Sequence, residues 1–262
     1  MQVKLVFLLT AMALFGLMTA LTRTTITPAR AADNSARLLA VGGPDFYGYT
    51  WSDGPLGTDW IDTTTIGTDT GLTGSGVNNA TGPIPLGFSF NYYTNSYTQL
   101  YISAAGYVSF TNQASWPGYQ NIPSTSPPNN VIAPYSTLTF IGSGSWVHYM
   151  TGGSAPNRYF VVEWHDLTVL PEDETYRFEL ILHENGDIVF QYDLMNYVGE
   201  SWLCASSGIE NDTGQYGLLY IYACGSSSVA SNTAVRFDRP VNPHSHVYLP
   251  VIMRNYPPPP EE

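Results

Sequence analysis

The apolar residues between Val41 and Asp238 show no 3.6-residue periodicity that is sustained over three helical turns. Short runs of β-branched and aromatic residues alternate instead with turns rich in glycine, proline and asparagine. This pattern predicts strands joined by tight turns and argues against long helices. We expect strands at residues 47–53, 60–65, 85–93, 98–111, 131–140, 146–150, 158–167, 175–184, 187–194, 202–209, 217–224 and 233–238.

The clearest local signal is a hairpin centred on Asn185 and Gly186. Apolar side chains at positions 176, 178, 180 and 182 alternate with their neighbours before it, and apolar residues resume at Ile188. Asn-Gly favours positive φ at both central positions of a type I′ turn, which matches the twist of two paired strands. The sequence therefore predicts an antiparallel hairpin with a type I′ turn.

About a dozen short strands, closely spaced turns and the lack of helical patterns predict an all-β fold, an antiparallel β-sandwich of jelly-roll-like type. No repeat or linker interrupts residues 42–238, so we expect one sandwich domain there, preceded by an N-terminal arm at 32–41. Residues 239–262 are expected to be a linker and a short tail. The four prolines at 257–260 cannot join a sheet ladder.

Residues 1–31 have the features of a secretory signal peptide. A positive start at Lys4 precedes an apolar run from Leu5 to Leu21, and Ala29 and Ala31 fit the small-residue positions of a cleavage site. The alternative is an uncleaved membrane anchor, although the run is at the short end of what spans a bilayer. Both alternatives place the rest of the chain outside the cytoplasm, secreted or at the cell surface, and after cleavage no membrane span is expected.

The chain has a formal net charge of −12 and only 11% charged residues, less than half of the ~25% typical of soluble domains. It offers no basic surface for DNA, RNA or anionic lipid, so nucleic acid is not an expected partner. Lys4 is the only lysine, so the exported part has none. The lack of lysine excludes four features from that part of the chain: Schiff-base chemistry, a P-loop, a catalytic Ser–Lys pair and lysine isopeptide crosslinks.

Cys204 and Cys224 are the only cysteines, and both lie in the exported part of the chain. An oxidising compartment favours a disulfide between them, whereas the alternative is two buried free thiols. A bridge across a loop of about 20 residues stabilises the fold by roughly 3 kcal/mol in the chain-entropy model.

Several stretches resemble, in order, a nidogen-like extracellular β-sandwich domain of bacterial exported proteins. They include GPDFYGYTWSD at 43–53, GPIPLGFSFNYY at 82–93, PNNVIAP at 128–134 and APNRYFVVEW at 155–164. The resemblance covers roughly residues 43–224 and implies a non-catalytic β-sandwich with no single known ligand. Such domains often stand beside secreted subtilisin-like peptidases.

Two further stretches bear on this resemblance. After the Ala-Pro motif the family usually carries an aromatic pair and two aspartates, whereas this chain has Tyr135-Ser136-Thr137-Leu138. If those aspartates hold a cation in relatives, this chain lacks them. The tail YLPVIMRN at 248–255 resembles the ending of many exported proteins of Chloroflexota.

The residues with catalytic potential are interpreted as surface groups, and the chain is not expected to be an enzyme. A glycosidase needs two carboxylates about 5–10 Å apart, and acids cluster in this chain between residues 163 and 174. His165 and Asp166 are adjacent, so in a regular strand they point to opposite faces. No Gly-x-Ser-x-Gly elbow occurs, and His244 and His246 have no third metal ligand nearby. The clustered acids are Glu163, Asp166, Glu172, Asp173 and Glu174.

No cofactor is expected, with one alternative left open. Asp53, Asp59, Asp62 and Asp69 lie in loops rich in glycine and threonine, where carboxylates and carbonyls can surround a structural calcium ion. Aspartate is also an ordinary turn former, and no spacing matches an EF-hand.

Loop aromatics are the most suggestive candidates for ligand binding. Trp116 and Tyr119 stand in a long loop rich in serine, asparagine, glutamine and proline, and Trp146 and Tyr149 are added as helpers. Aromatic ring faces bind the C–H surface of sugars while amides bond hydroxyls. The alternative is that these rings pack in the core.

Three functions remain open. The first is a non-catalytic structural, adhesive or assembly role at the cell surface, the second is a carbohydrate-binding module, and the third is a secreted hydrolase. Expected partners are an extracellular or cell-surface polymer, including a glycan, and other copies of the chain. Self-association would use strand addition by the arm before Gly42 or by residues 247–253.

Overall fold

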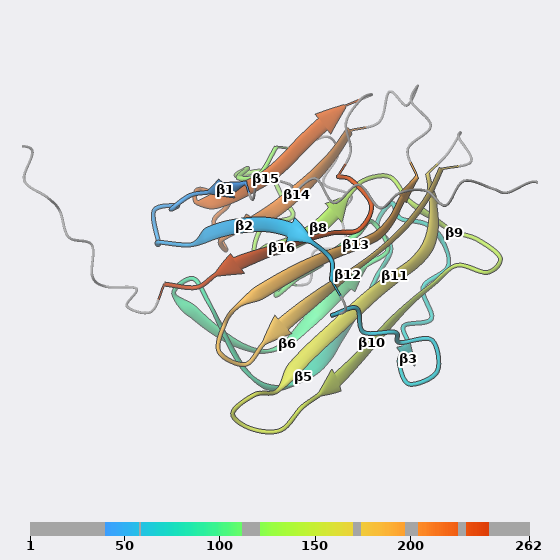
Figure 1. Ribbon diagram of the computed structural model, residues 1–262, viewed down its shortest axis with the longest axis horizontal. Helices are drawn as coiled ribbons and strands as arrows, with labels where there is room; N and C mark the ends of the chain where they lie inside the picture. The colour runs from blue at the N-terminus through green and yellow to red at the C-terminus, as the bar shows by residue number, and fades with distance from the viewer. Residues whose placement is uncertain are drawn as a thin grey trace, which may run out of the picture. The chain divides into compact units, whose positions relative to one another are not determined.

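A computed structural model describes residues 40–57, 59–111, 121–169, 174–196, 204–224 and 229–240. Within these ranges there is no helix, and strands form two sheets in which every pair is antiparallel (Figure 1). The predicted all-β antiparallel sandwich is confirmed.

In the larger sheet, several strands that are neighbours in space are far apart in the sequence. The order of its strands is β1 (Val41–Gly42), β2 (Thr50–Pro55), β16 (Thr233–Asp238), β13 (Ile188–Asn196), β12 (Glu174–His183), β11 (Tyr159–Val169), β10 (Trp146–Gly152) and β3 (Thr68–Asp69). Two short strands lie off this order: β9 (Phe140–Ile141) pairs with β11, and β4 (Gly74–Ser75) pairs with β9. The smaller sheet has the order β15 (Gly217–Cys224), β14 (Cys204–Glu210), β8 (Val131–Ser136), β7 (Tyr107–Ser109), β6 (Asn95–Ser103) and β5 (Ala80–Tyr92).

Strict alternation builds the core between the sheets. In β5, Leu86, Phe88 and Phe90 are buried while the residues between them are exposed, because successive side chains of a strand point to opposite faces. Burying each such side chain stabilises the fold by about 1.5–3 kcal/mol. Trp164 and Phe178 of the larger sheet belong to the same buried cluster.

Polar ends of buried aromatic residues join the two sheets. The indole N–H of Trp164 donates to the carbonyl of Ser103 at 2.9 Å, and the hydroxyl of Tyr192 donates to the carbonyl of Pro134 at 2.7 Å. Both rings are fully buried, so an unmade bond would leave a costly unsatisfied donor. These bonds hold the two sheets in one relative position.

The predicted hairpin is present as β12 and β13, with Leu182 opposite Ile188. The predicted turn type is wrong. The amide of Gly186 bonds the carbonyl of His183 at 2.8 Å, and of the two central residues only Gly186, at 97°, is among the described residues with positive φ. A type I turn followed by a left-handed glycine gives a three-residue loop in place of a two-residue type I′ turn.

Other strand predictions differ in detail. Residues 98–111 are split by a turn at 104–106, and residues 60–65 form no strand although they were predicted as one. The two-residue strands β1, β3, β4 and β9 carry too little alternation to be recognised from sequence.

The disulfide between Cys204 and Cys224 is confirmed, and the two residues are directly opposite each other in β14 and β15. β15 is an edge strand of the smaller sheet. There the indole N–H of Trp51 donates to the carbonyl of Leu219 at 3.1 Å, and the hydroxyl of Tyr220 donates to Asp53 at 3.0 Å. These bonds tie β15 to β2 of the other sheet.

Several predictions fall outside the described residues. These are the signal peptide, residues 32–39 of the arm, most of the tail, and the side chains of Trp116, Tyr119, Glu172, Asp173, Glu174, His244 and His246. In the described part of the chain, no helix is long and apolar enough to cross a membrane.

Candidate functional site

A row of polar side chains crosses the outer face of the larger sheet. His148 of β10 is opposite Glu163 of β11, Glu163 is opposite Glu179 of β12, and Glu179 is opposite Gln191 of β13. Their strand neighbours point inward to the core, so this row faces away from it. Despite that orientation, Glu163 is 1% exposed and Glu179 is 0% exposed.

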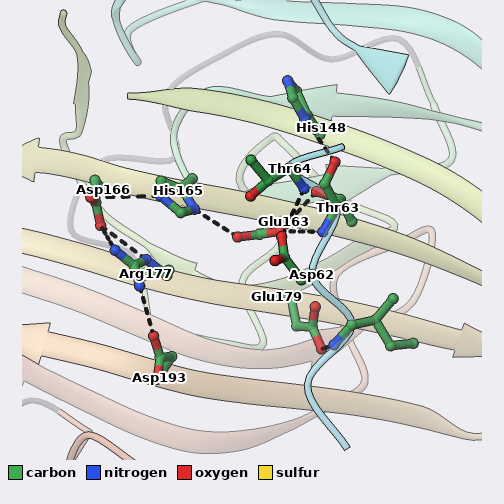
Figure 2. A network of polar contacts seen from close by, with 11 residues as sticks. Asp62, Thr63, Thr64, His148, Glu163, His165, Asp166, Arg177, Glu179 and Asp193 are labelled. Atoms are coloured by element: carbon green, nitrogen blue, oxygen red, sulfur yellow. Dashed lines mark hydrogen bonds and ion pairs between the residues drawn. The ribbon is translucent and has the colours of Figure 1, made fainter. Parts of the chain in front are cut away.

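Residues 59–67, here called the anchored segment, bury this row by running across the strands (Figure 2). Both the amide and the hydroxyl of Thr63 donate to Oε2 of Glu163, at 3.0 and 2.7 Å. Two residues earlier, the amide of Ile61 donates to Oε1 of Glu179 at 3.2 Å. Alternate residues of the segment are therefore bound by successive strands.

Both ends of the row also bind the anchored segment. The side-chain amide of Gln191 donates to the carbonyl of Asp59 at 3.3 Å, and Nδ1 of His148 lies 3.2 Å from the carbonyl of Thr63. These side-chain bonds replace the backbone ladder of a strand. They explain why the predicted strand at 60–65 forms no strand yet remains fixed.

Burial changes the ionisation of this row. Desolvation, aided by the neighbouring carboxylate of Glu163, raises the pKa of Glu179 to about 9. Glu179 is therefore an uncharged acid at neutral pH. Its Oε2 atom has no hydrogen-bond partner among the described residues, so no donor there favours the charged form.

A charged chain continues from Glu163 along the same face. Nδ1 of His165 lies 2.8 Å from Oε1 of Glu163, and Nε2 of His165 lies 3.6 Å from Asp166. Arg177 donates to Asp166 at 2.7 and 3.0 Å and to Asp193 at 3.1 Å. Figure 2 shows the resulting line of alternating acids and bases.

A bulge in β11 makes that chain continuous. The register shifts between Trp164 and Leu167, and Asp166 adopts a φ of 49°. The prediction that His165 and Asp166 point to opposite faces is therefore wrong, because a bulge suspends the two-residue alternation. The interpretation of Glu163 as a surface acid is also wrong, since the anchored segment covers it.

Two of the predicted aromatic residues, Trp146 and Tyr149, lie three positions apart in β10 and therefore point to opposite faces of the sheet. Trp146 lies half-buried on the outer face, stacked between His148 and His165 with ring centroids at 3.9 and 4.2 Å. Tyr149 packs against the core, 5.8 Å from the ring of Phe160. The structure therefore does not bring Trp146 and Tyr149 together.

A hollow of about 400 Å³ opens beside the charged chain. It is lined by the start of the anchored segment, the residues before it, the outer faces of β11 to β13, and the turn before β16. The lining residues are Leu56, Gly57, Trp60, Asp62, Thr64, Glu163, His165, Arg177, Asp193 and Asn232. Its size falls within the range typical of small-molecule sites.

A second buried carboxyl lies in the smaller sheet. Glu210 is 2% exposed and its Oε2 accepts a hydrogen bond from the amide of Ser124 at 2.9 Å. Burial raises the pKa of Glu210 to about 7. This residue also binds a covering loop to a sheet.

The aspartates considered for calcium are dispersed. Asp53 accepts from the amide of Ala40 and from Tyr220, while Asp62 and Asp69 accept from Thr64 and Gly71 within their own turns. Across the described ranges, no group of three His, Cys, Asp or Glu residues is placed to hold a metal ion.

Comparison with known proteins gives one finding. The profile of a family described as NIDO related matches residues 58–250. The chain belongs to this nidogen-related family. The match includes the anchored segment and every strand from β3 to β16. Curated proteins gave no match, and solved structures gave none. The nidogen relationship indicates an extracellular domain, as the sequence resemblance predicted, whereas the Chloroflexota-type tail stays a prediction.

Proposed function

We propose that this nidogen-related chain is a non-catalytic module with a structural, adhesive or assembly role, secreted or held at the cell surface. Family membership supports an extracellular assembly domain. A non-catalytic role is supported because the acids of the outer face serve to hold the anchored segment. Glu163 and Glu179 both bind the backbone of the anchored segment, and a general acid or base must instead reach its substrate.

The direct test is sedimentation of residues 32–262 with isolated bacterial cell envelopes. A monomeric acidic protein of similar size serves as the control. We expect selective retention of the chain on envelopes or its assembly into oligomers. A chain that stays monomeric and in the supernatant would contradict the structural or adhesive role.

The non-catalytic part needs its own measurement. A panel of peptide and glycoside substrates is incubated with the chain and with Glu163→Gln. We expect no turnover above the buffer rate for either protein. Turnover by the natural chain that Glu163→Gln abolishes would instead favour the secreted hydrolase.

Carbohydrate binding through the predicted aromatics is a second candidate. The observation that favours it is the position of Trp146 beside His165, a residue that lines the hollow. The ring faces of Trp146 stack on His148 and His165, so a glycan would meet the edge of the indole. Trp116→Ala and Trp146→Ala test it by retention on insoluble polysaccharides. Unchanged retention of both variants would remove this candidate.

A further inference from the structure

We propose that the hollow beside Arg177 binds a neutral pyranose unit of an extracellular polysaccharide. The proposal deepens the adhesive role given above, because it names the surface and the class of ligand. It uses Trp60, Asp193 and Asn232, none of which the sequence pattern singled out as ligand-binding residues. Each of these residues contributes a different contact to a sugar.

Trp60 supplies the apolar part of the site. It is half-buried and lines the hollow together with Leu56, which is buried. Its indole N–H makes no hydrogen bond to any residue that the structure describes. An aromatic ring with an available N–H suits a ligand that has one apolar C–H face and hydroxyls at its edge.

Asn232 supplies an amide in a fixed position. Its φ of 59° is left-handed, and its carbonyl accepts a hydrogen bond from the amide of Leu56 at 3.0 Å. Within the described part of the chain the side-chain amide has no partner, so it can both donate to and accept from a hydroxyl. The backbone bond places this amide at the wall of the hollow without using it.

The acids and Arg177 favour a neutral ligand. Arg177 is held between Asp166 and Asp193, so its charge is already compensated. Asp193 bonds Arg177 through Oδ2, and the described residues provide no partner for Oδ1. Asp62 adds an exposed carboxylate at the rim. Asp62, Glu163 and Asp193 outnumber Arg177 in the lining, so the hollow repels acidic sugars, while its oriented donors and acceptors fit hydroxyls.

The test is calorimetric titration with a panel of soluble hexasaccharides. The neutral probes are the hexasaccharides of cellulose, chitin, xylan and mannan, the acidic probe is a hexasaccharide of polygalacturonate, and the cationic probe is hexalysine. We expect at least one neutral hexasaccharide to bind and the polygalacturonate hexasaccharide not to bind. Binding of hexalysine without any neutral saccharide would overturn the proposal in favour of a basic peptide partner.

Variants locate the binding in the hollow. Trp60→Ala should weaken the affinity at least tenfold, and Trp60→Phe, which keeps a ring, should lose less. Asn232→Gly keeps the left-handed backbone and removes only the amide, so we expect a three- to tenfold loss with an unchanged melting temperature. Phe46→Ala, at a 52% exposed aromatic residue outside the hollow, is the matched control and should stay within twofold.

The outcomes separate this proposal from the adhesive role. If envelopes retain both the natural chain and Trp60→Ala equally, the hollow is not the site while the adhesive role stands. Saccharide binding that neither Trp60→Ala nor Asn232→Gly weakens would overturn the hollow as the site. If no neutral saccharide binds the natural chain, the ligand class is wrong whatever the envelopes retain.

Discussion

The carboxylate of Glu163 accepts two hydrogen bonds from Thr63, a residue 100 positions earlier in the chain. One comes from the backbone amide and the other from the hydroxyl, and both end on Oε2. A carboxylate in mid-strand would ordinarily face water, but here it fixes a segment that has no ladder of its own. Residues 59–67 therefore form a fixed layer over the outer face of the larger sheet.

Removing the hydroxyl of Thr63 should destabilise the domain. Thr63→Val keeps the shape of the side chain and deletes one hydrogen bond to a buried carboxylate, so we expect a loss of about 2 kcal/mol in the free energy of unfolding. Urea denaturation measures it. Thr64→Val, at the exposed neighbour, is the control and should change stability by less than about 0.5 kcal/mol. Equal effects of the two substitutions would argue against the anchoring bond.

Glu210 should make stability depend on pH below neutrality. Its pKa is about 7 in the folded chain and 4.5 ordinarily, so the folded state holds a proton that the unfolded state releases. This contribution is fully present below pH 4.5 and is lost as pH rises toward 7, by on the order of 2–3 kcal/mol. Glu210→Gln should reduce the slope of the pH profile over that window and leave the part that Glu179 contributes. An unchanged profile between pH 5 and 7 would contradict the buried state of Glu210.

Glu179 should extend the same trend above neutrality. With a pKa of about 9, it keeps its proton in the folded chain and loses it in the unfolded chain over the whole range from pH 4.5 to 9. Stability should therefore continue to fall from pH 7 to 9, a range in which Glu210 no longer contributes. Glu179→Gln is neutral at every pH and should remove this slope. Melting temperatures at pH 7, 8 and 9 measure it, with Glu210→Gln as the variant that keeps the slope.

The elements with strong local patterns could be predicted from the sequence. The alternation through β12 and β13 identified the hairpin, and the spacing of turns indicated the sandwich. Cys204 and Cys224 were expected to pair because both lie in the exported part of the chain. These features could be predicted because strand alternation and turns are local patterns in the sequence, and because the chain has only two cysteines that could pair.

The candidate site could not be predicted in the same way, because it depends on a segment lying across a face. The sequence predicts Glu163 as a surface acid, and both Glu163 and Glu179 do face outward. Only residues 59–63, about a hundred positions away, bury them. The bulge at Asp166 gives no sequence signal either, so its contact with His165 was missed.

The disulfide should contribute measurably although it lies at a sheet edge. Replacing Cys204 and Cys224 together with serine removes the constraint on a loop with a sequence separation of 20. We expect a loss of roughly 3 kcal/mol in the free energy of unfolding. Reducing the natural chain should shift its urea midpoint to the same value as the double variant. A double variant as stable as the oxidised chain would show that β15 is held by other contacts, including the Trp51 bond.

The central claim is that the outer-face acids hold residues 59–67 on the sheet, and amide hydrogen exchange measures this most directly. A peptide covering that segment should exchange slowly in the natural chain, because the amides of Ile61 and Thr63 are bonded to Glu179 and Glu163. In Glu163→Ala the same peptide should exchange much faster, while β12 and β13 stay protected. Fast exchange of residues 59–67 in the natural chain, or identical exchange in both proteins, would contradict the claim.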